Sequence, residues 1–172
     1  ELGSYVTKYR DLSSFWAIKK YYGDLIGLVG GTTVFHSADN GKIWRKRYQF
    51  GFAVNDLAVM DGIIFATSYM ALYKSADGGN SFSKVIDLPT YKTPRSLVKI
   101  GSDIYFSTQD SRGTGYGGEL YRSTDNGNSF SSVDRSTFKD YVIELYHDDI
   151  LTKTTHIELS IIDPQGQVAN SA

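Results

Sequence analysis

Short apolar runs recur along the whole chain and are separated by turns rich in glycine and aspartate. Four stretches, 16–29, 55–66, 96–107 and 141–152, each hold two such runs on either side of a Gly or Asp turn. Short runs bounded by turn residues predict β-strands, and two of them joined by a tight turn predict a hairpin. The pattern therefore predicts four β-hairpins distributed along the chain.

A turn sequence of eight residues follows each of the first three hairpins. The copies are 37–44 (SADNGKIW), 75–82 (SADGGNSF) and 123–130 (STDNGNSF), which share the pattern Ser-x-Asp-x-Gly-x-x-aromatic. They begin about 38 and 48 residues apart, a spacing typical of four-stranded propeller blades and not of helical repeats. We name these segments the first, second and third repeated turns.

Further strand-like runs flank the repeated turns, at 33–36, 71–74 and 119–122 before them and at positions such as 82–86 after them. One repeat is thus predicted to hold an inner hairpin, a third strand, the repeated turn and an outer fourth strand. Four repeats, roughly 10–50, 51–90, 91–135 and 136–172, would fill the chain as a single domain. The fourth keeps only a degenerate turn around Ser160, Asp163 and Gly166.

The residues shared by the repeated turns suit a structural role. Serine and aspartate side chains can hydrogen-bond to turn amides, glycine supplies a positive φ, and the aromatic ring can pack beneath the hairpin. We therefore expect turn braces, and not catalytic or ligand-binding groups, at Ser37, Asp39, Gly41, Trp44, Ser75, Asp77, Gly79, Phe82, Ser123, Asp125, Gly127 and Phe130.

The three repeated turns resemble the Asp-box, or bacterial neuraminidase repeat, of sialidases, sortilin-type receptors, xyloglucan-hydrolysing propellers and photosystem assembly factors. The resemblance covers the chain at the level of its repeats and implies an all-β propeller of about four blades. In that family the box resembles a stabilising element at the outer edge of a blade, so it transfers no site residue to this chain.

The two ends of the chain look complementary. The strand-like segment 4–9 precedes the first repeat, whereas the fourth repeat lacks an outer strand after Gly166. Because ring closure removes free sheet edges, we expect 4–9 to pair beside the last repeat. A fragment of a larger ring, or a ring completed by dimerisation, predicts the same pattern.

Composition narrows the function. Aromatic residues reach 14%, which is typical of a strand-rich chain. The 18 basic and 19 acidic side chains nearly balance, which disfavours a nucleic-acid partner. No apolar run is long enough to cross a bilayer and the opening residues lack a signal-peptide pattern, so we expect a soluble chain. The absence of cysteine leaves the compartment open, and a rigid, tyrosine-rich chain without cysteine favours an extracellular or surface-exposed location.

The third repeat is longer than the second, and the excess falls at 109–118, a glycine-rich segment. Insertions into a repeat are candidates for function because the repeat does not need them. We expect a binding patch in which Arg112 supplies donors, Asp110 lies beside it, and Tyr116 and Tyr69 supply stacking rings. A plain flexible loop is the alternative. Separately, Tyr22, Tyr69, Tyr91 and Tyr116 lie in or beside predicted loops and could form a binding face.

A cluster of basic side chains is a second departure from the repeat pattern. The side chains of Lys42, Arg45, Lys46 and Arg47 surround the first repeated turn. Such charges either protect a sheet edge from aggregation or meet an anionic partner, and the balanced net charge favours edge protection.

Catalytic and metal-binding patterns are weak. The three histidines, His36, His147 and His156, show no ligand spacing, and the sequence indicates no metal site and no cofactor. The carboxylates fall mainly in turns, so no catalytic pair can be named. We therefore expect a non-catalytic recognition or assembly module that binds a protein or glycan surface, alone or as part of a larger assembly. A sialidase-like glycoside hydrolase, or a fragment of one, is the alternative.

Overall fold

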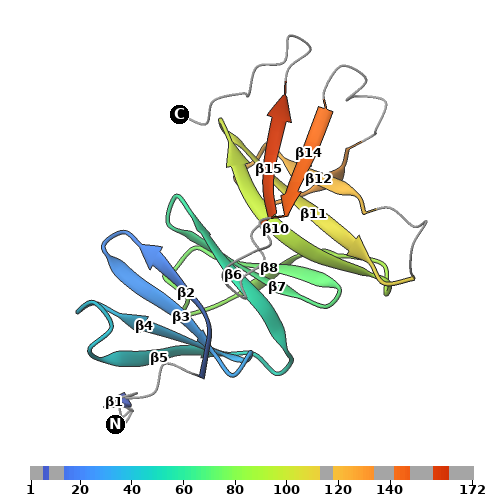
Figure 1. Ribbon diagram of the computed structural model, residues 1–172. Helices are drawn as coiled ribbons and strands as arrows, with labels where there is room; N and C mark the ends of the chain where they lie inside the picture. Colours follow the sequence, from blue (N-terminus) through green and yellow to red (C-terminus); the bar gives the residue numbers. More distant parts are fainter. Residues whose placement is uncertain (1–5, 8–13, 113–117, 134–141, 148–156, 163–172) are drawn as a thin grey trace. The chain divides into compact units, whose positions relative to one another are not determined.

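The computed structural model describes residues 6–7, 14–112, 118–133, 142–147 and 157–162, and Figure 1 shows that strands dominate them. The first sheet has the order β1-β5-β4-β3-β2. Its strands are β1 (Val6–Thr7), β2 (Phe15–Tyr21), β3 (Asp24–Val29), β4 (Thr33–Ser37) and β5 (Trp44–Gln49). The first four-stranded repeat, β2 to β5, therefore forms one antiparallel sheet in chain order.

The second and third repeats form sheets of the same design. The second has the order β6-β7-β8-β9, with β6 (Val54–Met60), β7 (Ile63–Ser68), β8 (Ala71–Ser75) and β9 (Ser83–Asp87). The third has the order β10-β11-β12-β13, with β10 (Lys92–Ile100), β11 (Asp103–Asp110), β12 (Leu120–Ser123) and β13 (Ser131–Ser132). The prediction of an all-β fold made of four-stranded, blade-like sheets is confirmed.

The chain divides into two compact units. One contains residues 1–95 and 108–118, and the other contains residues 96–107 and 119–172. The first two sheets, together with the segments that begin β10 and end β11, belong to the first unit. The assignment of the whole chain to a single domain stays a prediction.

The main core of the first compact unit joins the first two sheets. Ile26, Leu28 and Val34 of the first sheet form one buried cluster with residues of the second sheet, among them Leu57 and Ile64. Every residue of β7 is buried, as expected for a strand with apolar packing on both faces. Each of these large aliphatic side chains contributes about 1.5 to 3 kcal/mol by leaving water.

Register shifts, or β-bulges, occur at matching positions of the first and second repeats. Both β2 and β6 shift register near their start, next to Trp16 and Asn55. The fourth strands also shift, next to Arg47 in β5 and Val85 in β9. Because bulges bend a strand and redirect its side chains, the matched positions indicate that both repeats use the same blade geometry.

The N-terminal strand corrects one expectation. Val6 and Thr7 pair with Arg45 and Trp44 of β5, at the edge of their own first sheet. For these two residues the expected pairing beside the last repeat is wrong, while the rest of 4–9 lies outside the described residues. The outer strand of the first sheet offers unpaired backbone groups that any nearby extended segment can satisfy.

The last described hairpin also differs from its prediction. β14 (Val142–His147) pairs with β15 (Ile157–Ile162), and His147 lies opposite Ile157. The second strand therefore begins later than the predicted hairpin 141–152 implies, and Ser160 of the degenerate turn lies inside β15. The apolar residues Ile157, Leu159 and Ile161 match a strand pattern at least as well as the earlier run does.

The three repeated turns share one hydrogen-bond pattern. In each, the serine hydroxyl donates to the aspartate and accepts from the glycine amide, with Ser75 Oγ lying 2.8 Å from Asp77 Oδ1 and 2.9 Å from Gly79 N. Asp77 also accepts the amides of Asn80 and Ser81, each at 3.0 Å. The glycines at the fifth position have φ between 75° and 84°. Each turn is thus closed by its own side chains.

Replacing Asp77 with alanine is expected to lower the free energy of unfolding by about 1 to 2 kcal/mol. The carboxylate accepts several bonds that alanine cannot replace, although solvent exposure limits their net value. Urea denaturation measures the change. The control is Asp87→Ala, which removes an exposed ion pair to Lys84 and should change stability by less than about 0.5 kcal/mol. Equal losses in both variants would contradict the bracing role.

The same carboxylate should make stability sensitive to acid. Burial raises the pKa of Asp77, but the hydrogen bonds from Ser81 and Ser75 outweigh it and lower the pKa to about 2. Because this lies below the ordinary value of 3.8, the stabilisation is complete above about pH 4 and is lost as the pH falls through about 2. The stability difference between the wild type and Asp77→Asn, measured in urea, should therefore shrink from pH 5 to pH 2. A stability difference that stays constant between pH 5 and pH 2 would contradict the lowered pKa of Asp77.

Candidate functional site

The glycine-rich insertion begins inside a strand. Gln109 and Asp110 are the last residues of β11, and Ser111 and Arg112 form the turn that follows. Tyr116 lies in 113–117, outside the described residues. At the far end of the insertion, a Cβ on Gly118 would collide with the carbonyl oxygen of Thr108, so the close return of the chain to β11 requires glycine there.

Arg112 is held in a fixed orientation by Asp110 and Tyr91. Its Nε donates to Asp110 Oδ1 at 3.0 Å and its Nη2 to Oδ2 at 2.7 Å, while its amide also donates to Oδ1. The guanidinium carbon lies 3.6 Å from the centroid of the Tyr91 ring. This combines a bidentate ion pair with a cation–π stack, and both fix the plane of the guanidinium.

Burial within this trio is uneven. The Asp110 side chain is only 1% exposed, whereas that of Arg112 is 41% exposed. The hydrogen bonds from the Arg112 side chain lower the pKa of Asp110, against the opposite effect of burial. The buried carboxylate therefore acts as a support, and the solvent-facing part of the trio is the arginine.

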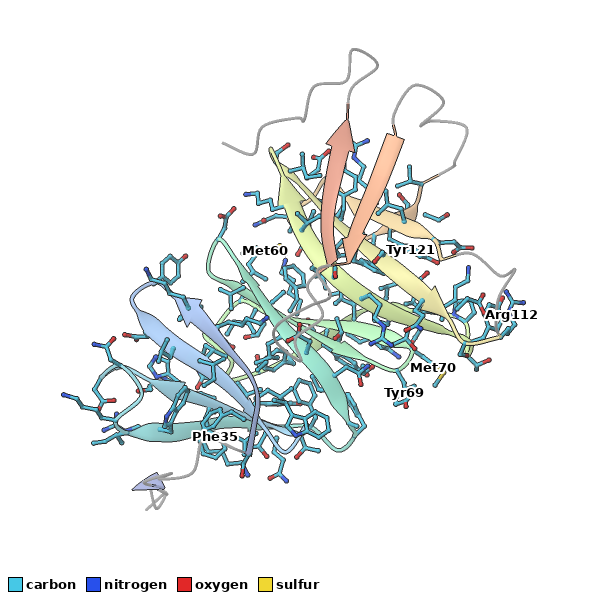
Figure 2. The ribbon with its side chains drawn as sticks, viewed as in Figure 1. Phe35, Met60, Tyr69, Met70, Arg112 and Tyr121 are labelled. Carbon is cyan, nitrogen blue, oxygen red and sulfur yellow. The ribbon has the colours of Figure 1, made fainter. Side chains whose placement is uncertain are left out.

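Tyr69 and Met70 project from the turn between β7 and β8, as Figure 2 shows. Their exposed fractions are 69% and 41%. The Met70 carbonyl accepts the amide of Leu88 at 2.7 Å, and three residues later the Tyr91 carbonyl accepts the amide of Ser111 at 2.8 Å. Residues 88–91 thus connect the Tyr69 turn to the Arg112 turn.

Two exposed aromatic residues that the sequence did not single out occur at the same end of the strands. Trp16, 60% exposed, packs its ring over Gly31, whose carbonyl accepts the amide of Val54 at 2.7 Å. Phe52, 41% exposed, lies 5.0 Å from the Tyr73 ring. Trp16 and Asn55 occupy matching bulge positions of the first and second repeats. The replacement of a polar residue by tryptophan at this position was the signal available in the sequence.

Strand direction places these residues at corresponding ends of their sheets. β2, β6 and β10 begin at this end of their sheets, and β3, β7 and β11 finish there. We define the loop face as the set of side chains at this end, all from the first compact unit: Trp16, Phe52, Tyr69, Met70, Tyr91, Asp110 and Arg112.

Tyr22 does not join the loop face. It occupies the β2–β3 turn with φ of 54°, is 80% exposed, and donates from its hydroxyl to the Asp61 carbonyl at 3.4 Å. Since β2 ends where β3 begins, this turn is at the opposite end of the sheet from the β3–β4 turn. The contacts of the Tyr22 ring with Asp61 and Gly62 show that it packs on the neighbouring β6–β7 turn.

The described residues show neither a metal-binding cluster nor a membrane-spanning helix. In this part of the chain, no group of three His, Asp or Glu side chains is arranged to hold a metal ion. The same residues contain no helix that is long and apolar enough to span a membrane.

Comparison with known proteins supports the fold. No family model and no curated protein matches the sequence. A GH74 enzyme from Niastella koreensis is similar in structure, with a TM-score of 0.50 and 19% identity over 65% of this chain and 19% of that one. The N-terminal domain of Nup159 aligns with a TM-score of 0.45 and 11% identity over 90% of this chain and 61% of that one. This chain thus spans less than two thirds of either protein.

At such low identity the likeness to the GH74 enzyme bears on the fold alone. It agrees with the three antiparallel sheets of four chain-ordered strands. The chain is therefore an all-β protein with a propeller-like fold.

Proposed function

We propose that this chain is a non-catalytic recognition module that binds a protein through the loop face. The observation that carries the proposal is the Asp110–Arg112–Tyr91 trio, in which a buried carboxylate and a tyrosine ring hold an exposed guanidinium in one orientation. A side chain ordered in advance loses little entropy on binding. Structural support of this kind is characteristic of binding residues.

The rest of the loop face has the chemistry of a protein interface. Trp16, Phe52, Tyr69 and Met70 are all at least 41% exposed. Aromatic residues, methionine and arginine are enriched at protein interfaces, and tryptophan, tyrosine and arginine are enriched among the residues that dominate binding energy. Most of the exposed large apolar side chains in the described part of the chain belong to this one end, which favours a protein partner over a glycan.

We also propose that the three repeated turns are Asp-boxes with a bracing role alone. Their shared Ser–Asp–Gly hydrogen bonds support the assignment. The aspartates of these turns point into their own amides, as Asp125 does toward Asn128 and Ser129. Carboxylates engaged in this way are poor candidates for general acid–base catalysis, which supports a non-catalytic function.

Selection from a peptide library displayed on phage tests the proposed function. The immobilised wild-type protein should enrich peptides with apolar and aromatic residues, and the variant Tyr69→Ala/Arg112→Ala should not enrich them. Parallel assays use a glycan array and chromogenic glycosides. Binding to glycans alone would contradict a protein partner, and turnover of a glycoside would contradict the absence of catalysis.

A further inference from the structure

A polar network connects the first sheet to the second repeated turn. His36 on β4 is 9% exposed, and its Nε2 lies 2.8 Å from Asp24 Oδ2 on β3. Its Nδ1 lies 3.0 Å from Nη2 of Arg47 on β5. The same guanidinium donates from Nη1 to Asn80 Oδ1, also at 3.0 Å. Asn80 belongs to the second repeated turn, so Arg47 bridges a histidine and the neighbouring repeat.

These contacts define the protonation state of His36. A guanidinium has only donors, so Nδ1 of the ring must accept from Arg47 and cannot carry a proton. The single ring proton is then on Nε2, where it donates to the Asp24 carboxylate. The network therefore requires a neutral imidazole in the Nε2–H tautomer.

The other repeats show that a blade does not need this arrangement. The position of His36, immediately before the repeated turn, holds Lys74 in the second repeat and Arg122 in the third. Arg122 forms an ion pair with Asp103, which stands at the start of β11 as Asp24 does at the start of β3. Among the first three repeats, only the first combines an aspartate at this strand start with a side chain that changes charge near neutral pH.

Arg47 also departs from the repeat. It occupies the bulge position of β5, where Val85 stands in β9. A valine there has no donor, whereas Arg47 reaches both His36 and Asn80. This use explains one of the basic side chains around the first repeated turn better than edge protection does.

We propose that His36 and Arg47 form a proton-sensitive latch between the first sheet and the second repeated turn. When His36 takes up a proton, Nδ1 becomes a donor and the imidazolium repels the guanidinium, so Arg47 leaves the ring. The protonated ring keeps its bond to Asp24, now as an ion pair. Arg47 then no longer orients toward Asn80, and the second repeated turn loses this hydrogen bond to the first sheet, while Gly79 and Phe82 stay packed against Val34 and Tyr48.

The charged groups around His36 have opposite effects on protonation of its ring. Asp24 on β3 favours the protonated ring, while Arg47 on β5 opposes it. Arg45 is opposite His36 in the β4–β5 register and adds a second positive charge on the same strand. Tyr21 on β2 is opposite Asp24, and Asp77 belongs to the same turn as Asn80. Only the Arg47 contact requires an unprotonated Nδ1.

Histidine titration by NMR on the full chain tests the latch. The His36 ring signals are identified by their loss in His36→Gln. In the wild type near pH 7.5 the nitrogen shifts should report the Nε2–H tautomer. Arg47→Met should raise the midpoint of the His36 titration by at least about 0.5 pH unit, a threefold increase in proton affinity, because the donor and the charge are both removed. Asp24→Asn should lower the midpoint.

Arg45→Met is the matched control, since it removes an equal charge from the same strand without a bond to the ring. Equal shifts in the Arg45 and Arg47 variants, or no shift in either, would overturn the proposal. Amide exchange at Gly79, Asn80 and Ser81, corrected for intrinsic rates, provides a second measurement. It should accelerate several-fold between pH 7.5 and pH 5.5 in the wild type and remain constant in Arg47→Met. Unchanged wild-type exchange would also overturn it.

Discussion

Replacing Gly79 with valine is expected to destabilise the protein by about 2 to 5 kcal/mol. Gly79 has φ of 84°, a conformation that costs a residue with a Cβ about 1 to 2 kcal/mol. An added Cβ would also lie 3.3 Å from Val34 Cγ1 and 3.5 Å from Ile64 Cδ1, in the core between the first two sheets. The further methyl groups of valine would overfill this site, at about 1 to 3 kcal/mol.

Two other glycines separate these contributions. Gly30 has φ of 56° with no atom within 4 Å of an added Cβ, so Gly30→Val tests the backbone conformation alone. Gly23 has neither a positive φ nor a neighbour within 4 Å, so Gly23→Val should change stability by less than about 0.5 kcal/mol. Urea denaturation of the three variants should rank them in this order, with Gly79→Val the least stable. Equal effects at Gly79 and Gly30 would show that contact with the core at Gly79 is unimportant.

The sequence predicted the elements that depend on local chemistry. The run 71–74 became β8 (Ala71–Ser75), and the predicted hairpin 55–66 became β6 and β7. These elements are recognisable because their apolar runs are short and bounded by glycine or aspartate, which favour turns. Repetition strengthened each assignment, since an error in one repeat would have been visible in the others.

Pairing between distant segments was less predictable. Several sheet edges could satisfy the backbone of 4–9, and the sequence contains no local signal that selects β5 for Val6 and Thr7. Similarly, two apolar runs after His147 could pair with β14, and the later one does. Such choices depend on which segments meet in space and not on the residues between them.

The candidate site was predictable in its parts and not in its geometry. The insertion identified Arg112 and Asp110 as neighbours, but it did not show that Tyr91, about twenty residues earlier in the chain, stacks on Arg112 and bonds to Ser111. Trp16 was missed because tryptophan in a strand usually indicates core packing. The His36 network draws on three strands and a turn of the next repeat, so no sequence spacing reveals it.

Replacing Tyr69 and Arg112 together with alanine is expected to weaken binding of peptides selected by the wild type at least tenfold. Both side chains are exposed, and partly buried anchors of this type contribute about 1 to 2 kcal/mol each on association. Tyr69→Ala removes few packing contacts, whereas Arg112→Ala leaves the Asp110 carboxylate without its charged partner, so the melting temperature of the double variant is measured first and the affinities are compared well below it. Biolayer interferometry with one selected peptide measures the affinity.

Tyr22→Ala is the matched control for this prediction, because it removes an even more exposed tyrosine from the opposite end of the same sheets. It should leave the peptide affinity within about twofold of the wild type, since its ring packs on the Asp61–Gly62 turn and not on the loop face. Asp110→Asn tests the support of Arg112 separately: the guanidinium remains, but its charged partner is lost, so the affinity should fall by about threefold through a faster dissociation rate. If Tyr22→Ala weakens binding as much as the double variant, the peptide binds elsewhere and the loop face is not the recognition surface.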